Sequence, residues 1–447
     1  MEEEDDVEEE EESEEDRRSY RRKRRVRNQI IAYSVVVLFI IALVIGGIVA
    51  GQRISASLKA KKQEAELEAA RLEQEQEQQQ PDEMIIEAPP TIEVATMDEQ
   101  IDELVDNIIS TMPLEDKVAG LFIIKPEALT GVETVTKAAD ATQEALNQYA
   151  VGGLIYFSQN IIDKEQLTDM LSATASMSRY PIFLAVDEEG GEISRVANSD
   201  IDVIKVDNMA DIGANGDAAA AYETGMTIGS YLKDLGFNID FAPVADVVTD
   251  EGSDILGSRS FGTDAGVCAE MVSNVVDGMQ GTGVSACLKH FPGIGSAKED
   301  THDGKVEMDT TLDSMKNSDF LPFQAGIEAG ADFVMVSHVI AASLDEDMVP
   351  SSFSSVVVTD ILRGELGFDG VVITDALDMG AITDNYASDE AAIKAIVAGV
   401  DMLLMPENFE EAYNGLLTAV QEGVISEERI NESLRRIYRI KYANKLT

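Results

Sequence analysis

The stretch KHFPGIGSAKEDTHDG, from Lys289 to Gly304, holds two of the three histidines of this 447-residue chain, His290 and His302. Histidine can give and take a proton near neutral pH, because the pKa of a free imidazole is about 6.5. The same stretch contains glycines and a lysine. A metal site, a phosphate-binding loop, a general acid or base and an ordinary surface loop are therefore all chemically possible.

Two of these chemistries lack the residue spacing that they need. The chain has no His-x-x-x-His or His-Glu-x-x-His pair, and Asp300 and His302 are only two residues apart, so we predict no metal and no other cofactor. The segment FPGIGSAK does not match a Walker phosphate loop, because no Ser or Thr follows Lys298. The chain also lacks a Gly-x-Ser-x-Gly motif, which excludes the commonest arrangement of a serine hydrolase.

The remaining arrangement combines a rigidly held carboxylate with an acid and a histidine on a loop. Asp375 closes the apolar run GVVITD, and a strand end can hold a nucleophile in a fixed position. Asp300 could fix the tautomer of His302 and favour its protonated form. A general acid or base of this kind contributes roughly a hundredfold to ten-thousandfold in rate. The spacing alone leaves open that Asp300 and His302 only form a turn.

Short apolar runs alternate with amphipathic stretches between Met97 and Thr447. Each run is mostly uniformly apolar and ends in polar residues or glycine, which is typical of parallel strands buried on both faces. Eight runs in about 350 residues predict an α/β fold, a (β/α)8 TIM barrel, with an open doubly wound sheet as the alternative. The runs are VAGLFII, GGLIYFS, IFLAVDEEGG, FNIDFAPVADV, SACLKHFPG, DFVMVSHV, GVVITDAL and GVDMLLMP.

A barrel predicts where the functional residues meet. The active sites of such barrels lie at the carboxyl ends of the strands, so the residues that close the runs should share one pocket. These residues are Asp187, Asp246, Lys289, His290, His338, Asp375 and Met405. A structural core does not need such a mixture of acids, bases and histidines, so we expect an active site there.

The residues before Met97 differ in composition. Residues 1–28 are first acidic and then basic, and we predict a cytoplasmic tail without a core. Residues 29–51 are uncharged and long enough to span a bilayer as a helix. The basic residues directly before this run predict that the following chain lies outside the cell. A cleavable signal peptide is the alternative, although the apolar run is longer than is usual for one.

The composition of residues 52–96, the net charge and the cysteine count limit the possible domain organisation and binding partners. Residues 52–96 are rich in Ala, Glu, Gln and Lys and then in proline, which predicts a helical stalk followed by an extended linker. Residues 97–447 should then form the barrel, held outside the cell membrane by a single-pass anchor. The formal net charge of -50 disfavours nucleic acid as a partner. Cys268 and Cys287 are too few for a disulfide framework, and we expect two buried free thiols.

Seven segments of the chain, in their order, resemble the N-terminal barrel domain of family 3 glycoside hydrolases, and most of all its β-N-acetylglucosaminidase (β-hexosaminidase) branch. The resemblance covers essentially all of Met97 to Thr447. The segments are MPLEDKVAGLF, VDEEGGEISR, FAPVADV, GSRSFG, KHFPGIGSAKEDTH, PFQAGIEAGADFVMVSHV and GFDGVVITDALDMGAI.

The resemblance implies a role for each matching residue. Asp375 matches the nucleophile of the family, His302 the acid/base and Asp300 its supporting acid. The residues that match positions holding the terminal sugar are Asp187, Arg195, Arg259, Lys289 and His290. The chain departs from the family at one position of this loop, because Ile294 stands where Phe-Pro-Gly-His-Gly has its histidine. We expect this change to alter the packing of the loop more than catalysis.

The implied function is that of a retaining, exo-acting glycoside hydrolase. It should remove terminal non-reducing β-N-acetylglucosamine from peptidoglycan fragments or related glycans through a covalent glycosyl-enzyme. Two other activities stay open, a β-N-acetylglucosaminide phosphorylase and a β-glucosidase or xylosidase. An alternative of another class is a catalytically inactive surface protein that binds sugar. The expected partners are a carbohydrate and the membrane, and the catalytic domain is expected to be monomeric.

Overall fold

The computed structural model describes residues 96–249, 253–302 and 304–446. The predicted tail, the apolar run 29–51 and the predicted stalk up to residue 95 lie outside these residues. None of the helices in the described ranges is long and apolar enough to cross a membrane. The membrane span proposed from the sequence therefore stays a prediction.

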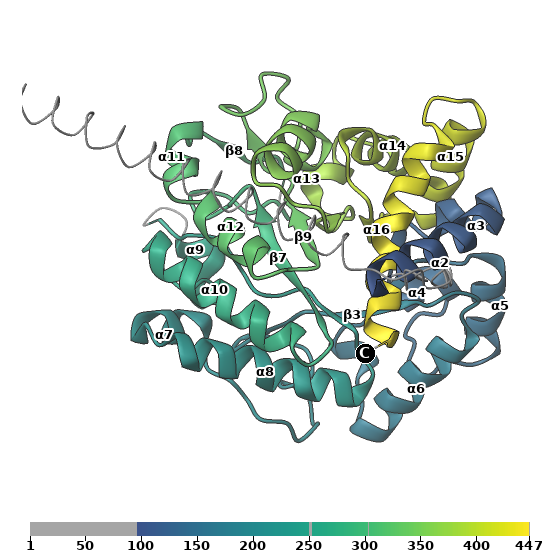
Figure 1. The fold of residues 1–447 in the computed structure, drawn as a ribbon, viewed down its shortest axis with the longest axis horizontal. Helices are drawn as coiled ribbons and strands as arrows, with labels where there is room; N and C mark the ends of the chain where they lie inside the picture. Colours follow the sequence, from purple (N-terminus) through teal and green to yellow (C-terminus); the bar gives the residue numbers. More distant parts are fainter. Residues whose placement is uncertain (1–95, 250–252, 303, 447) are drawn as a thin grey trace, which may run out of the picture. The chain divides into compact units, whose positions relative to one another are not determined.

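Eight parallel strands form the centre of the described fold, one from each of the eight apolar runs (Figure 1). All residues of these strands are buried, as expected for strands covered on both faces. The order of hydrogen-bonded neighbours is β11-β9-β7-β6-β3-β2-β1-β12. The strands are β1 Phe122–Ile124, β2 Gly153–Ile155, β3 Phe183–Val186, β6 Ile239–Asp240, β7 Ser285–Phe291, β9 Phe333–Val336, β11 Val371–Thr374 and β12 Leu403–Leu404.

The first and last strands of this order are joined, so the sheet closes. Ile373 of β11 pairs in parallel with Met402, which directly precedes β12. The amide of Thr374 donates to the carbonyl of Met402 over 3.1 Å. Closure removes the unpaired edges that an open sheet would leave. The sheet is therefore the predicted eight-stranded parallel barrel, and the alternative of an open doubly wound sheet is wrong.

Helices cover the outside of the barrel. Figure 1 shows α8 beside α10 and α2 beside α16, and both pairs are in contact. The longer helices are α2 Met97–Thr111, α5 Asp140–Gln148, α6 Lys164–Met177, α8 Ala218–Leu235, α10 Ala265–Gln280, α12 Phe320–Glu328, α14 Ser388–Ala398, α15 Phe409–Gln421, α16 Glu427–Leu446 and the π-helix η4 Val356–Glu365. The shorter ones are α3 Leu114–Ala119, α4 Pro126–Thr130, α7 Met209–Asn215, α9 Ser253–Leu256, α11 Leu312–Asn317, α13 Gly380–Thr383, η1 Ser158–Asn160, η2 Gly257–Arg259 and η3 Ser351–Phe353.

Short polar side chains determine where several of these helices begin. Thr96 accepts a hydrogen bond from the amide of Glu99, whose carboxylate accepts from the amide of Thr96, so α2 starts with a capping box. The carboxylates of Asp217 and Asp264 cap α8 and α10 by accepting hydrogen bonds from amides of the first turn, without a capping box. Each such cap stabilises its helix by about 1 kcal/mol.

Two small sheets lie on the connections at the carboxyl ends of the strands. The antiparallel pair of β4 (Glu188–Gly190) and β5 (Ile193–Ser194) follows β3. The parallel pair of β8 (Glu307–Met308) and β10 (Ile340–Ala341) joins the connections that follow β7 and β9. These small sheets hold the connections that surround the strand ends. The prediction for the cysteines is confirmed, because Cys268 and Cys287 are both buried and free.

Candidate active site

A chain of ion pairs crosses the strand ends from β3 to β7. The Nζ atom of Lys289 lies 3.0 Å from Oδ1 of Asp187 and 2.6 Å from Oε1 of Glu189. Glu189 also accepts two hydrogen bonds from Arg259, over 2.7 and 2.8 Å. The side chains of Lys289 and Glu189 are only 3% and 2% exposed, whereas those of Asp187 and Arg259 are 17% and 25% exposed. The outer members can therefore still reach the hydroxyl groups of a ligand.

The groups in this chain keep one another charged. Burial alone would raise the pKa of Glu189, but Lys289 and Arg259 lower it to about 2. Burial alone would lower the pKa of Lys289 and of Arg259, but the neighbouring acids, with Glu189 first, raise both. A fixed row of full charges therefore lies along the strand ends at neutral pH.

Glu188 faces away from this row, because successive side chains of an extended segment point in opposite directions. Its carboxylate accepts hydrogen bonds from the amides of Val196 and Ala197, over 2.7 and 2.8 Å, and from the hydroxyl of Tyr231 over 2.8 Å. These bonds hold the turn after β5 in place. The alternation along the acidic run thus separates the acids that face Lys289 from the one that supports the loop.

Arg195 offers a donor that no residue of the described chain uses. Its Nη2 lies 3.8 Å from Oδ2 of Asp187, and its guanidinium lies over the ring of Phe157, 5.6 Å from the centroid. The Nε atom is buried and has no hydrogen-bond partner within the described residues. A buried donor without a partner costs free energy, so contacts within the described chain do not by themselves explain the position of this side chain, which is 29% exposed.

Asp246 holds His290 and the start of the following loop. Its Oδ2 lies 3.1 Å from the amide of His290 and 2.8 Å from Nδ1 of the same residue, and its Oδ1 accepts from the amide of Ile294 over 2.8 Å. Because a carboxylate only accepts, Nδ1 of His290 carries a proton, which leaves Nε2 for a ligand. Ile294 is 8% exposed and belongs to the hydrophobic core, so the residue that departs from the family pattern lies in the interior.

Asp375 lies directly after β11, and the chain around it is held in place. Its amide donates to the carbonyl of Val336 over 2.8 Å, and its Oδ1 accepts from the amide of Ala376 over 2.8 Å. Burial raises the pKa of Asp375, but interactions with the neighbouring imidazoles of His290 and His338 and the hydrogen bond from the amide of Ala376 outweigh it and lower the pKa. Asp375 is therefore an ionised carboxylate with unused lone pairs, as a nucleophile requires.

His338 supports the chain beside Asp375. Its Nε2 lies 3.0 Å from the carbonyl oxygen of Ala376, and its Nδ1 lies 2.9 Å from Oγ of Ser352. A carbonyl only accepts, so Nε2 carries the proton and Nδ1 accepts from the hydroxyl. Burial lowers the pKa of His338, which keeps this ring neutral. The sequence placed His338 in the polar ring, and the structure makes it a support for the residue that follows Asp375.

The loop with Asp300 and His302 reaches the segment that follows Asp375. Oδ1 of Asp300 accepts from the amide of His302 over 2.9 Å and lies 2.7 Å from its Nδ1. The amides of Gly380 and Ala381, at the start of α13, donate to the carbonyls of His302 and Thr301 over 3.3 and 3.0 Å. The side chain of His302 is 70% exposed. The structure thus brings the proposed nucleophile and the proposed acid/base to neighbouring connections at the same end of the barrel.

The electrostatics of this pair favour a proton on Nδ1. Partial burial would raise the pKa of Asp300, but the hydrogen bonds from His302, together with the charge of Arg259, lower it. An ionised Asp300 accepts from Nδ1–H and leaves Nε2 of His302 as the nitrogen that can exchange a proton with a ligand. The Asp300–His302 turn that the spacing alone allowed is present, and it presents an exposed ring.

Sequence reasoning missed several groups at this end of the barrel. Glu189 stood in the acidic run after β3, and only strand alternation could have indicated that it shares a face with Asp187. Lys125 follows β1, pairs with Asp378 over 2.7 Å and lies 5.7 Å from the ring centroid of Phe157. Met405 follows β12 and contributes no polar group. In the described part of the chain, no three His, Cys, Asp or Glu side chains are grouped so that they could hold a metal ion.

The sequence comparisons identify relatives of one kind. The model of the family described as "Glycosyl hydrolase family 3 N terminal domain" matches residues 98–440. A protein named beta-hexosaminidase A from Pseudoalteromonas piscicida is 33% identical over 327 residues, which cover 67% of this chain and 54% of that protein. A protein named beta-hexosaminidase from Stenotrophomonas maltophilia is 34% identical over 287 residues, 63% of this chain and 84% of its own length.

A solved structure shares the fold. The family 3 β-N-acetylglucosaminidase from a Paenibacillus species superposes with a TM-score of 0.70 at 35% sequence identity. The match covers 75% of this chain and 63% of that one. The chain thus spans about half of the Pseudoalteromonas protein and under two thirds of the Paenibacillus protein.

Proposed function

The chain belongs to glycosyl hydrolase family 3, and on that premise we propose that it is a retaining, exo-acting β-N-acetylglucosaminidase. One observation carries the proposal. The ionised Asp375 at the end of β11 and the Asp300–His302 pair lie on connections that are hydrogen-bonded to each other through α13. The names of the relatives supply the substrate class, a terminal N-acetylhexosamine.

The proposed reaction has two displacements at the anomeric carbon. In the first, Asp375 forms a bond to that carbon while the bond to the leaving oxygen breaks, and the leaving oxygen takes the proton from Nε2 of His302. In the second, neutral His302 removes a proton from water, the water oxygen bonds to the anomeric carbon, and Asp375 leaves. Asp300 holds Nδ1–H of His302 throughout, so only Nε2 exchanges protons.

The terminal sugar occupies the strand ends in this proposal. Asp187, Lys289 and Arg259 form the charged row that can donate to and accept from ring hydroxyls, and His290 adds a free Nε2. The partly exposed guanidinium of Arg195 adds further donors. Since the catalytic ring is exposed while the row of charges is buried, the sugar lies inside and the leaving group points outward. This direction suits removal of one terminal residue.

We also propose the cellular setting from the sequence. The uncharged run 29–51 behind a basic cluster anchors the chain in the cell membrane and leaves the barrel outside as a monomer, where peptidoglycan fragments or related glycans are within reach. Membranes that carry the full chain should retain it in high salt and release it in detergent. A variant without residues 29–51 should be recovered without detergent. Release of the intact chain by salt alone contradicts the anchor.

The activity is tested with the full-length chain on aryl β-glycosides of N-acetylglucosamine, glucose and xylose. We expect the N-acetylglucosaminide to be preferred by about a hundredfold in kcat/KM or more, since the pocket must gain about 3 kcal/mol from the acetamido group. The released sugar should first appear as the β-anomer in the NMR spectrum. Preference for the glucoside overturns the substrate, and sugar 1-phosphate formed in phosphate buffer indicates a phosphorylase. A folded chain that cleaves none of the three is a binding protein.

The role of His302 is tested through the leaving group. His302→Ala should slow cleavage of an alkyl glycoside by about 10²–10⁴-fold, because an alkoxide leaves poorly without a proton. An aryl glycoside with an acidic phenol should lose far less in its first step. Equal losses on both substrates contradict the assignment of His302 as the proton donor.

A further inference from the structure

The charged row at the strand ends covers only one side of the barrel. It runs from β7 to β3 through the ion pairs of Lys289 with Asp187 and Glu189. On the other side, the order of neighbouring strands continues from β3 through β2, β1 and β12 back to β11. An ion pair between Lys125 and Asp378 joins the connections that follow β1 and β11 on this second side.

The pair is well defined by its surroundings. Nζ of Lys125 lies 2.7 Å from Oδ2 of Asp378, and the two side chains are 34% and 31% exposed. The same Nζ lies 5.7 Å from the centroid of the Phe157 ring, and the guanidinium of Arg195 lies 5.6 Å from that centroid. Because an aromatic ring attracts cations, Phe157 restricts where the ammonium group can lie. Lys125 is therefore held between a ring after β2 and a carboxylate after β11.

The segment that begins at Asp375 is held by neighbouring strands over its first residues. The amide of Asp375 donates to the carbonyl of Val336, the last residue of β9, over 2.8 Å. The amide of Leu377 donates to the carbonyl of Leu404, the last residue of β12, over 2.9 Å. These bonds join main-chain atoms and do not require an ion pair. The proposed nucleophile should therefore keep its position without Lys125.

Asp378 lies further along this segment, two residues before α13, which begins at Gly380. The first two amides of α13 donate to the carbonyls of Thr301 and His302, over 3.0 and 3.3 Å. The loop that carries His302 thus rests on α13. Since the ion pair with Lys125 fixes the chain directly before α13, it also fixes the support of this loop.

We propose that Lys125, acting through Asp378, is a positioning residue for the acid/base of the proposed reaction. The pair holds α13, α13 holds the loop, and the loop places Nε2 of His302 at the leaving oxygen. The inference rests on the proposed function, because it concerns the proton donor of that reaction. Loss of Lys125 should therefore impair proton donation and leave the attack by Asp375 nearly intact.

The two steps are separated by the leaving group. Lys125→Met should lower kcat/KM on an alkyl β-N-acetylglucosaminide by about 10- to 100-fold, as a misplaced catalytic group does. An aryl glycoside whose phenol leaves without a proton should lose about threefold or less. Lys394→Met is the matched control, because Lys394 pairs with Glu390 over 3.5 Å and lies 5.7 Å from the ring centroid of Tyr386. That ion pair lies within α14 and joins no two elements, so both rates should stay unchanged.

A combined variant separates positioning from general structural damage. If Lys125 acts through His302, Lys125→Met should cost nothing further on the alkyl glycoside once His302→Ala has removed the ring. A further loss of about tenfold or more in that background overturns the proposal, because independent effects multiply. Equal losses on the alkyl and aryl glycosides in Lys125→Met overturn it as well. Asp378→Asn should show the same difference between the two glycosides, and full activity of this variant contradicts the role of the pair.

The histidines provide a measurement that needs no turnover. The chain has three of them, so NMR of the full-length chain with labelled histidine rings gives three signals, each assigned by substitution. Lys125→Met should shift the signal of His302 and leave those of His290 and His338, whose hydrogen bonds in the described structure do not involve α13. A His302 signal that stays in place overturns the proposal. If the unmodified chain cleaves no glycoside, the proposed function fails, whereas a shift confined to His302 still shows that Lys125 places this ring.

Discussion

Two clusters of buried charge lie at opposite ends of the barrel and differ in how completely their hydrogen bonds are satisfied. At the amino-terminal end, Asp401 lies two residues before β12 and is fully buried. It pairs with Arg363 and Arg436, and it accepts from Ser433 over 2.7 Å and from the amide of Val372 over 3.0 Å. Arg429 lies within 3.8 Å as well. Both oxygens of this carboxylate are therefore occupied by the protein itself.

At the carboxyl-terminal end, the polar side chains are also held in fixed positions, but some of their hydrogen-bonding atoms have no partner in the described chain. Asp375 accepts one amide hydrogen bond, the Nε of Arg195 has no partner in the described chain, and Nε2 of His302 is exposed. This saturated carboxylate holds three arginines and the elements η4, β11 and α16 together, but it has no lone pair left for a substrate. The comparison indicates that the Asp401 cluster serves stability and that the open groups around Asp375 serve chemistry.

The largest effect on activity should come from a substitution at the carboxyl-terminal end of the barrel. Asp375→Asn keeps the shape of the side chain and removes the nucleophile, so kcat on an aryl N-acetylglucosaminide should fall at least about 10⁴-fold. The free energy of unfolding in urea should change by only about 1 kcal/mol, because the side chain makes a single hydrogen bond. Activity near that of the unmodified chain contradicts the assignment of Asp375.

A substitution at the amino-terminal end should instead lower the stability and leave the activity almost unchanged. Asp401→Asn leaves the partly buried guanidinium groups of Arg363, Arg429 and Arg436 without a counter-charge, so the free energy of unfolding should fall by about 3–5 kcal/mol. The kcat of the molecules that remain folded should stay within about twofold, because this cluster lies away from the strand ends where the proposed active site lies. Urea unfolding followed by circular dichroism measures the first quantity and active-site titration the second.

Asp106→Asn is the matched control for Asp401. Its carboxylate pairs with Arg435 over 2.9 Å, but the side chain of Asp106 is 61% exposed. An exposed pair contributes at most about 1 kcal/mol, so this variant should remain near the unmodified chain. Equal losses in Asp401→Asn and Asp106→Asn would remove the basis for treating the buried cluster as structural.

At the carboxyl-terminal end of the barrel, most of the residues that meet could be predicted from the sequence. At the amino-terminal end, few of the contacts of Asp401 could be. Uniformly apolar runs mark strands buried on both faces, and the residue that ends each run lies at the carboxyl end of its strand. That reasoning found Asp187, Lys289 and Asp375, and the family resemblance found Arg195, Arg259 and His302. All of these residues lie at one end of the barrel, on the strand ends and the connections that follow them.

Contacts between residues that do not end an apolar run could not be predicted from the sequence. Asp401 meets Arg363 and Ser433 only because the barrel closes between β11 and β12, and nothing in the spacing of these residues indicates their pairing. Glu189 and Lys289 are a hundred positions apart and become partners because β6 pairs with both β3 and β7. The polar pocket that Asp319 lines depends on how the two stems of the loop that carries His302 come together. Such contacts are set by tertiary packing and not by local periodicity.

Asp319 provides a test that depends on pH. Its carboxylate is buried like that of Asp401, but like that of Asp375 it has no ion-pair partner among the described residues. Its pKa is about 7 in the folded chain against an ordinary value of 3.8. Between these values the folded state binds more protons than the unfolded state, so its contribution to stability falls as pH rises through this window. Asp319→Asn lacks this loss and should gain about 2–4 kcal/mol on the unmodified chain between pH 4 and pH 8.

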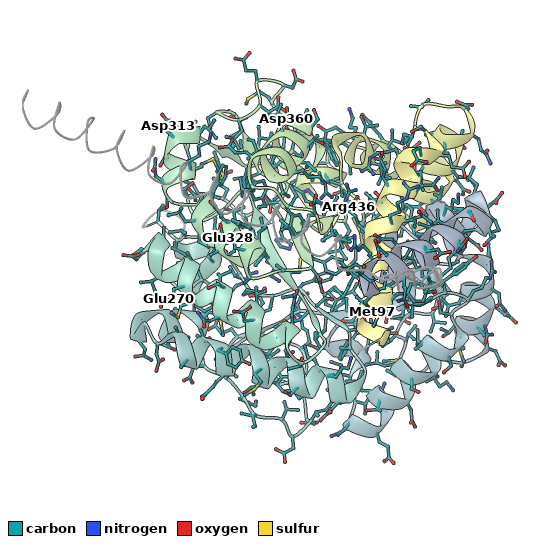
Figure 2. The ribbon with its side chains drawn as sticks, in the orientation of Figure 1. Met97, Glu270, Asp313, Glu328, Asp360 and Arg436 are labelled. Carbon is teal, nitrogen blue, oxygen red and sulfur yellow. The ribbon has the colours of Figure 1, made fainter. Side chains whose placement is uncertain are left out.

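Urea unfolding of both chains across this range measures the difference. A difference between them that does not change with pH means that Asp319 does not titrate in this window. Asp313→Asn should show no such divergence, because Asp313 is an exposed acid on the neighbouring α11 and its charge is hydrated in both states (Figure 2).

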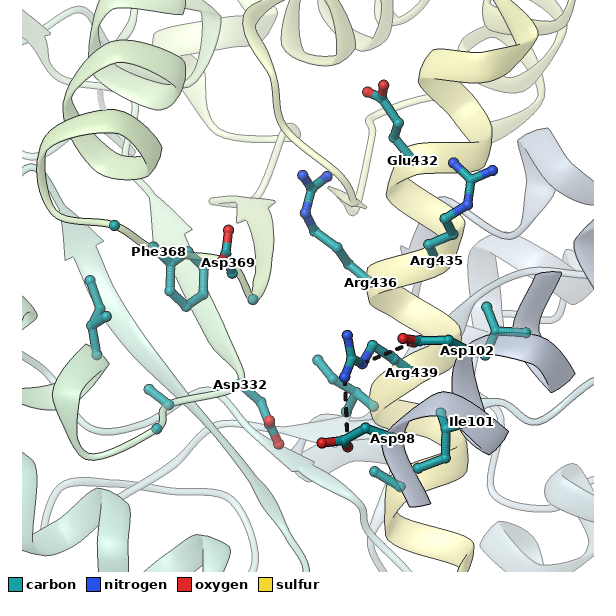
Figure 3. A pocket seen from close by; sticks show the side chains of 18 of the residues that line it. Asp98, Ile101, Asp102, Asp332, Phe368, Asp369, Glu432, Arg435, Arg436 and Arg439 are labelled. Carbon is teal, nitrogen blue, oxygen red and sulfur yellow. Dashed lines mark ion pairs between the residues drawn. The ribbon is translucent and has the colours of Figure 1, made fainter. Parts of the chain in front are cut away.

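The smallest effect should come from the rim of the amino-terminal end, where α2 and α16, together with the segments that precede β9 and β11, line a pocket of about 840 Å³ (Figure 3). Figure 3 shows Arg439 directed at Asp98 and Asp102, and the pairs measure 3.6 and 3.4 Å. These side chains are half or more exposed, so Arg439→Met should change the free energy of unfolding by at most about 0.5 kcal/mol, and less in high salt. A guanidinium group like those that pair with Asp401 would then contribute almost nothing at the rim, about one turn beyond Arg436 on the same helix. A loss above about 1.5 kcal/mol would instead mean that α2 depends on this pair for its attachment to α16, and that burial alone does not separate structural from incidental charges in this barrel.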